Sequence, residues 1–221
     1  MASTFWPRSV AALVLAGLSL TGGVSHAEDA AKERYYLELK AVTPKSELKA
    51  EAVKMAIPRV LSQLKKAFER HPQIVAKLEG APDPKLDPDG YRAYLDRSQL
   101  TGAFTVTVEL TEASEASTPM TDKPGAQVHE IRLALRMLGT RIPDDTLGFT
   151  GHGKANAKAE IGAKVSELQR QETWDQLSEL AVEKAIKTAL EELTLAAKSK
   201  PKPKPKSKAK RPISVVPPTP H

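Results

Sequence analysis

The chain has 221 residues, no cysteine, 5% aromatic residues and a formal net charge of +6. The lack of cysteine excludes a disulfide framework, a cysteine metal site and a cysteine-linked lipid anchor. Of the 33 Lys and Arg residues, one lies in the first 27 residues and eight lie from Lys198 onward, which leaves 24 in between against 27 Asp and Glu. The middle of the chain is therefore weakly acidic, which argues against a nucleic-acid-binding domain.

Residues 1–27 have the pattern of a secretory signal peptide. Arg8 precedes the apolar run Ala11–Leu20, and small residues precede a cleavage site near Ala27. The alternative is an uncleaved membrane anchor, but the run is short for a bilayer span and rich in Gly, Ser and Thr. We expect a periplasmic or secreted protein without a transmembrane segment after signal cleavage.

Residues 28–197 are long enough for a single domain with its own core. Alternating apolar side chains predict a first strand over 35–42, which Thr43-Pro44 closes. The apolar stripe from Val53 to Phe68 predicts an amphipathic helix, with Ser46 as its N-cap. Pro58 lies inside this stripe and predicts a kink or a second helix start.

The middle of the domain carries weaker patterns. Residues 73–78 fit either a short strand or another helical turn, and 91–100 are ambiguous. Residues 80–90 alternate Asp with Pro and predict a loop. Over Phe104–Leu110, apolar side chains alternate with threonines and a glutamate, which predicts a strand. Residues 112–125 predict a polar loop between neighbouring strands.

The rest of the predicted fold is arranged around the stretch from Val128 to Ile161. Ile131–Met137 alternate apolar with mostly polar residues, and a second alternating run covers 147–161. The connector 139–146 holds a Pro-Asp-Asp turn signal. These features predict an antiparallel ribbon, which needs other elements to cover its apolar face.

The most regular helical pattern in the chain is the apolar stripe from Trp174 to Leu193, with Thr173 as its N-cap. About 24 helical residues span about 36 Å, which is enough to cover the ribbon. We therefore predict an α+β fold, with a mostly antiparallel sheet and two amphipathic helices packed on one face. A disordered Lys/Pro-rich tail, 198–221, follows the domain.

One segment comes close to a nucleotide-binding motif. Gly148–Ala155 nearly matches a phosphate-binding loop, but Ala155 stands where the magnesium-binding Ser or Thr is required. The residues that follow alternate as in a strand and do not open a helix. A glycine-kinked strand or bulge is therefore the favoured interpretation.

Candidate metal and catalytic groups are scattered. His129 and His152 could face one another across the ribbon, which would bring two imidazoles together. Four histidines of the mature chain lack metal-ligand spacing: His71, His129, His152 and His221. Three aspartates fit a solvated turn better than a calcium loop: Asp83, Asp87 and Asp89. The sequence predicts no catalytic residue, no cofactor and no metal ligand, and hence no enzyme.

The tail is the most specific functional feature. Alternating Lys and Pro favour an extended spacer, and its cations can contact an anionic wall polymer or lipopolysaccharide. The alternative is a disordered end that only improves solubility. The predicted polymer-binding residues are Lys198, Lys200, Lys202, Lys204, Lys206, Lys208, Lys210 and Arg211.

The order of elements adds a resemblance. A Tyr35-Tyr36-Leu37 strand precedes an amphipathic helix, and Ile131–Met137 with a Gly-punctuated partner strand precedes a terminal helix. This order resembles the α/β domain shared by the N-terminal domain of the Tol-Pal translocation protein, the curli-secretion lipoprotein and the penicillin-binding-protein activator lipoprotein. The resemblance covers most of 35–195 and implies a periplasmic, non-enzymatic, partner-binding module. The chain lacks the anchoring cysteine and the propeller repeats of these relatives.

Three functional hypotheses follow. The first is a cell-envelope adaptor that binds a protein partner through its α+β domain, with the basic tail as a tether. The second is an exported hydrolase or ligand-binding enzyme that uses scattered carboxylates and His129 or His152. A pocket that gathers perturbed carboxylates or histidines favours the enzyme, and an exposed apolar patch or flat sheet face favours the adaptor. The third is a cationic polymer-binding protein with no specific nucleic-acid ligand.

Overall fold

A computed structural model describes residues 33–162 and 166–199. The predicted signal peptide and the tail beyond Ser199 lie outside these residues. The elements are β1 Tyr35–Pro44, α1 Ala50–Arg70, β2 Ile74–Val75, α2 Pro88–Arg97, β3 Gly102–Pro119, β4 Gln127–Arg141, β5 Leu147–Ile161 and α3 Glu167–Ser199. None of the helices in the described part is long and apolar enough to cross a membrane.

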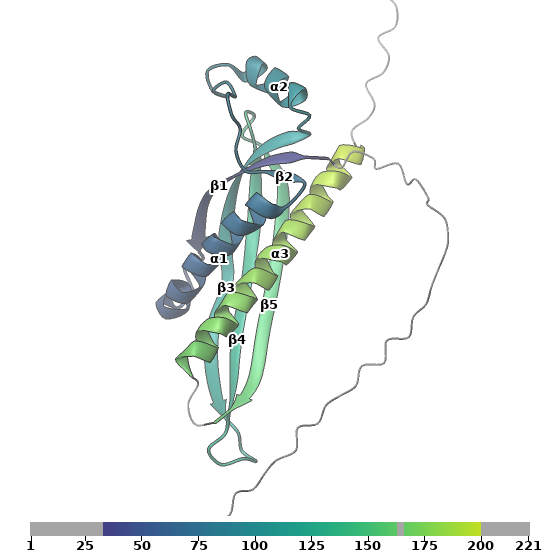
Figure 1. The fold of residues 1–221 in the computed structure, drawn as a ribbon. Helices are drawn as coiled ribbons and strands as arrows, with labels where there is room; N and C mark the ends of the chain where they lie inside the picture. The colour runs from purple at the N-terminus through teal and green to yellow at the C-terminus, as the bar shows by residue number, and fades with distance from the viewer. Residues whose placement is uncertain (1–32, 163–165, 200–221) are drawn as a thin grey trace, which may run out of the picture. The chain divides into compact units, whose positions relative to one another are not determined.

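The five strands form one sheet in the order β2-β1-β3-β4-β5 (Figure 1). β3, β4 and β5 pair antiparallel, whereas β1 pairs parallel with both β2 and β3. Parallel pairing of β1 and β3 needs a long connection, which α1, β2 and α2 supply. The predicted α+β class is thus confirmed, and the sheet is mixed with an antiparallel majority.

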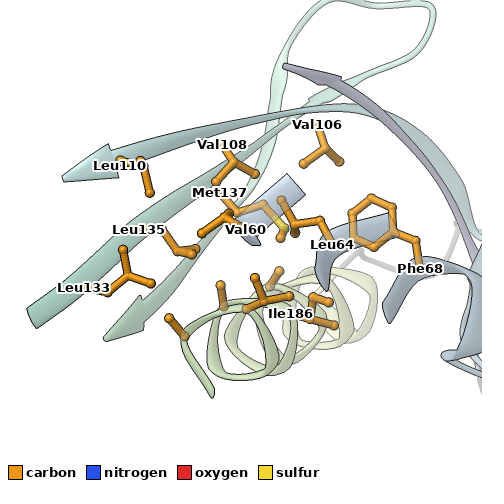
Figure 2. Packing of buried hydrophobic residues seen from close by; sticks show 14 of the residues in the cluster. Val60, Leu64, Phe68, Val106, Val108, Leu110, Leu133, Leu135, Met137 and Ile186 are labelled. Carbon is orange, nitrogen blue, oxygen red and sulfur yellow. The ribbon is translucent and has the colours of Figure 1, made fainter. Parts of the chain in front are cut away.

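Two helices, α1 and α3, cover one face of the sheet, as predicted (Figure 1). The side chains that alternate along β4 all lie in the core: Ile131, Leu133, Leu135 and Met137. Figure 2 shows Val60 and Leu64 of α1 and Ile186 of α3 directed towards this strand and β3. Burial of these aliphatic side chains is the main stabilising contribution to the domain.

The third helix, α2, was not predicted: it covers the end of the predicted loop 80–90 and most of the segment 91–100, which the sequence left ambiguous. Its Tyr91 and Leu95 pack with Tyr36 and Ile142 in a second, smaller cluster. Tyr36 follows Tyr35 of the main core, and neighbouring strand residues point to opposite faces, so α2 covers the other face of the sheet. Asp87 caps α2, because its Oδ1 accepts from the Gly90 N–H at 2.8 Å.

The predicted ribbon is present as β4 and β5, paired from Gln127 and Ile161 to Thr140 and Leu147. A register shift leaves Gly148 as an extra residue, which is a β-bulge. A Cβ atom on Gly153 would overlap the carbonyl oxygen of Ala181 in α3. The glycines of 148–155 therefore serve a bulge and a close helix contact within a strand.

The prediction of a polar loop over 112–125 is wrong for its first part. β3 continues to Pro119 and stays paired with β4 after a bulge at Thr111. The segment contains small and polar residues because its side chains are partly solvated there, whereas Ala113 still enters the core. Only 120–126 connect the two strands.

Both predicted helix caps are wrong. α1 begins after Lys49, whose side chain makes no capping hydrogen bond, so Ser46 lies outside the helix. α1 also runs through Pro58 without interruption. α3 begins at Glu167, and Thr173 lies inside it with its hydroxyl donating to the Gln169 carbonyl at 2.7 Å.

α3 also lies along the outer edge of β5. The backbone N–H of Thr150 donates to Glu192 Oε2 at 2.7 Å, and the N–H of His152 donates to Thr188 Oγ1 at 2.8 Å. Lys184 Nζ donates to the Lys154 carbonyl at 3.0 Å. Side chains of the helix thus satisfy backbone groups that an edge strand otherwise exposes.

Candidate functional site

Two regions along the α1–α3 layer could act on other molecules. The polar cluster lies at the N-terminal ends of α1 and α3 and consists of Glu115, Ser117, His129, Arg170 and Trp174. The helix groove lies between the C-terminal half of α1 and the outer side of α3. A small pocket of about 260 Å³ adjoins the polar cluster, and the helix groove has a volume of about 900 Å³.

Glu115 is the centre of the polar cluster. Arg170 Nε donates to its Oε1 at 2.6 Å, and Trp174 Nε1 donates to its Oε2 at 3.2 Å. Glu115 and His129 lie on neighbouring strands and point to the core face, whereas Arg170 and Trp174 come from the first turns of α3. These bonds attach the start of α3 to the sheet.

The electrostatics of the polar cluster favour an ionised Glu115. Burial acts to raise the pKa of this carboxyl, but the hydrogen bonds from Arg170 and Trp174 and the charge of Arg170 outweigh it and lower the pKa. The hydrogen bond to Glu115 raises the pKa of Arg170 further above its usual range. The pair is therefore fully charged at neutral pH and is a poor proton donor or acceptor.

His129 is buried and lies between two partners. Its Nδ1 is 3.0 Å from Ser117 Oγ, and its Nε2 is 3.4 Å from Glu115 Oε1 without hydrogen-bond geometry. A serine, an imidazole and a carboxylate are the groups of a nucleophilic triad. Here the carboxylate is already paired with Arg170, so it is poorly placed to stabilise a charged imidazole.

The predicted pairing of His129 with His152 is wrong. β4 and β5 align His129 with Ala159, and they align His152 with Arg136, so the two imidazoles occupy different rows of the ribbon. His152 is exposed on the outer face. His71 follows α1 and lines the helix groove, where burial lowers its pKa.

The helix groove has an apolar floor and charged walls. The floor residues are Ala67, Val182, Ile186, Leu190 and Leu195. The charged residues along the walls are Lys66 and Arg70 from α1, and Glu179, Glu183, Lys187 and Glu191 from α3. Leu195 is 68% exposed at the end of the groove where α3 approaches its C-terminus. Such a surface can bind an apolar molecule or an apolar segment of a polypeptide.

The remaining predicted groups make no site together. Asp83 accepts from the Lys85 N–H at 2.8 Å, so its loop is a turn. Among the described residues no group of three or more His, Asp or Glu side chains could hold a metal ion. Lys198 lies in the last turn of α3, and the other seven predicted polymer-binding residues lie outside the described residues.

Sequence reasoning missed Arg170, Glu115 and the helix groove. Glu115 stands in the segment predicted to be a loop, and Arg170 precedes the predicted start of the last helix. The groove gives no local signal, because it depends on the spacing between α1 and α3. The sequence did carry a signal for the position of α3. Its repeat of small residues, Ala181, Ala185 and Ala189, lies opposite Gly151 and Gly153 of β5 and indicates a close contact of this helix with that strand.

Neither the family models nor the curated proteins gave a match to this chain. Solved structures do show likenesses. A proposed homolog of a neuraminyllactose-binding hemagglutinin from Helicobacter pylori is 10% identical, with a TM-score of 0.40, over 76% of this chain and 94% of that one. A DUF330-family protein from Xanthomonas campestris is 9% identical, with a TM-score of 0.39, over 76% and 88%.

A minor lipoprotein from Acinetobacter baumannii is 9% identical, with a TM-score of 0.33, over 70% of this chain and 90% of that one. All three TM-scores are below 0.5, and we transfer no function from these proteins. The likenesses do not test the narrower resemblance to the Tol-Pal, curli-secretion and penicillin-binding-protein activator domains, which stays a prediction.

Proposed function

We propose that this protein is a non-enzymatic adaptor of the bacterial cell envelope that binds a segment of a partner polypeptide in the helix groove. The observation that carries the proposal is the open groove of about 900 Å³ with its apolar floor. The signal-peptide pattern of residues 1–27 supports export to the envelope. The basic tail then tethers the domain to an anionic wall polymer or lipopolysaccharide.

The groove offers a matched pair of positions for testing this function. Leu195 at the groove and Leu168 near the start of α3 are exposed to 68% and 66%. A photo-crosslinking amino acid at position 195 should yield a discrete adduct with one envelope protein, whereas the same amino acid at position 168 should not. Ala67→Trp, which fills the groove, should abolish the adduct.

The proposal fails if both positions give the same adducts, or if Ala67→Trp leaves the adduct of position 195 unchanged. Thermal unfolding of each variant checks that the domain is folded. The same experiment with a chain that ends at Ala197 separates the domain from the tail. An adduct that persists without the tail assigns partner binding to the domain.

One observation favours a second candidate, a hydrolase. Ser117 Oγ lies 3.0 Å from His129 Nδ1, and His129 Nε2 lies 3.4 Å from Glu115 Oε1. A hydrolase predicts that Ser117→Ala abolishes the turnover of p-nitrophenyl acetate, a small activated ester. An adaptor predicts that Ser117→Ala and the unchanged protein give the same slow background rate, because Glu115 is committed to Arg170.

A further inference from the structure

The two walls of the helix groove differ in charge, and the difference begins where the two helices touch. Arg59 Nε of α1 lies 2.9 Å from Asp175 Oδ1 of α3. At this contact α1 therefore presents a cation and α3 presents an anion. Residues three or four positions apart lie on the same side of a helix, so the residues that follow at this spacing continue each wall of the groove.

The α1 wall keeps its positive sign towards the open end of the groove. Lys66 and Arg70 line the groove and are exposed. They lie about 10 and 16 Å beyond Arg59 at 1.5 Å per helical residue. Neither makes an ion pair with another residue in the described part of the chain. The α1 wall thus carries two cations without a partner.

The α3 wall is negative over the same stretch. Glu179 and Glu183 line the groove about 6 and 12 Å beyond Asp175. Both are exposed, and neither makes an ion pair with another described residue. Lys187 also belongs to this wall, but its Nζ lies 4.0 Å from Glu191 Oε1, so these two side chains compensate one another. Glu179 and Glu183 remain as the uncompensated charges of the α3 wall.

The groove therefore separates a positive wall from a negative wall above an apolar floor. A segment that inserts between the walls can offer carboxylates to Lys66 and Arg70, and it can offer cations to Glu179 and Glu183. A segment with charges of one sign meets a like charge on one wall, which is unfavourable at an interface. A segment without charges partly desolvates both walls and returns no ion pair.

We infer that the partner segment has an apolar face and two charged edges, an acidic edge that faces α1 and a basic edge that faces α3. This inference rests on the proposed function of the groove, because it names the chemistry of the polypeptide that binds there. The two walls also set the direction of the bound segment. A segment turned end to end on the same floor would bring its acidic edge against the α3 wall.

Charge reversal on the α1 wall is the first test. The photo-crosslinking amino acid at position 195 in the full chain reports binding. Lys66→Glu combined with Arg70→Glu should lower the yield of the adduct about tenfold or more, because two attractive contacts become repulsive. The matched control is Lys54→Glu combined with Lys65→Glu, which makes the same change of net charge at exposed positions of α1 outside the groove. It should leave the yield unchanged.

The α3 wall has its own matched pair. Glu183→Lys should lower the yield, whereas Glu172→Lys, at an exposed position of α3 outside the groove, should not. Mass spectrometry of the adduct then identifies the captured segment of the partner. Reversal of the acidic residues of that segment to Lys should restore the adduct with Lys66→Glu and Arg70→Glu, and it should not restore the adduct with Glu183→Lys.

The inference and the proposed function fail in different ways. An adduct that Ala67→Trp abolishes but charge reversal of either wall leaves unchanged overturns the inference and leaves the adaptor function standing. Equal losses in the wall variants and their controls also overturn the inference, because net charge alone then acts. A captured segment without charges of both signs does the same. Absence of any adduct from position 195 of the unchanged chain overturns the function of the groove itself. Thermal unfolding checks that every variant is folded.

Discussion

The same two helices cross the same sheet in both regions, yet the two ends of the α1–α3 layer differ. At the N-terminal end, Arg170 and Trp174 bind Glu115, and the adjoining pocket measures about 260 Å³. At the C-terminal end, the layer leaves a groove of about 900 Å³. Between them, Arg59 Nε of α1 lies 2.9 Å from Asp175 Oδ1 of α3 as an ion pair.

The difference suggests separate roles for the two ends: the polar cluster attaches α3 to the sheet, and the helix groove is open to another molecule. Titratable groups with perturbed pKa values are typical of functional sites, but those of the polar cluster are fully engaged with one another. The groove is the larger opening, and its apolar lining includes Leu195, which is 68% exposed. Partner binding is therefore expected where the helix layer is open, and stability where it is hydrogen-bonded.

The strongest way to break this comparison is to move the middle of α3, between the two ends, off the sheet. Gly153→Val should destabilise the domain by about 3 kcal/mol or more, because its Cβ would overlap the Ala181 carbonyl and the backbone must shift. Gly162→Ala, with open space around its Cβ, should change stability by less than about 0.5 kcal/mol. Urea unfolding measures both variants. Similar values for the two would contradict the close contact.

A more local change tests only the N-terminal end of the layer, where the polar cluster attaches α3 to the sheet. Glu115→Gln should cost about 1–3 kcal/mol, because it removes the shorter of the two carboxylate contacts of the partly buried Arg170 and leaves only Glu167 at 3.4 Å. Glu112→Gln is the matched control, since Glu112 makes an exposed pair with Lys154 at 3.2 Å and should lose at most about 0.5 kcal/mol. The crosslinked adduct of position 195 should form in both variants. Its loss in Glu115→Gln alone would show that the two ends are coupled.

The smallest effect is the pH dependence of the attached end. The folded pKa of Glu115 is lowered, so its contribution to stability is complete above the unfolded value of about 4.3 and is lost as the pH falls through the folded pKa. The unchanged protein should therefore lose more unfolding free energy between pH 6 and pH 3 than Glu115→Gln. Glu130 and Glu167 also have lowered pKa values and should give both proteins a common slope. Parallel curves for the two proteins would contradict the role assigned to Glu115.

The elements with a full apolar stripe could be predicted from the sequence. The alternation from Ile131 to Met137 and the stripe from Trp174 to Leu193 placed the ribbon and the long helix. The second half of β3 could not be predicted, because one of its faces is solvated and its small residues are also typical of loops. α2 buries only Tyr91 and Leu95, which is too few for a periodic pattern.

The two candidate sites differ in the same way. His129 and His152 were recognised as candidates by residue type, but their separation depends on the ribbon register, which pairs His129 with Ala159, seven positions from His152. The contact of Glu115 with Arg170 joins residues 55 positions apart. The helix groove depends on how α1 and α3 pack side by side, and the sequence pattern of each helix gives no information on that packing.

The row of contacts from α3 to the edge of β5 has a consequence for how the protein behaves at high concentration. Glu192, Thr188 and Lys184 bond to the backbone of Thr150, His152 and Lys154, and a strand from another molecule cannot bond to the same groups. The helix therefore blocks this part of the β5 edge against addition of a strand from another chain, which is how fibrillar aggregates extend. Substitutions at positions 184, 188 and 192 are expected to favour aggregation even where the folded domain keeps its stability.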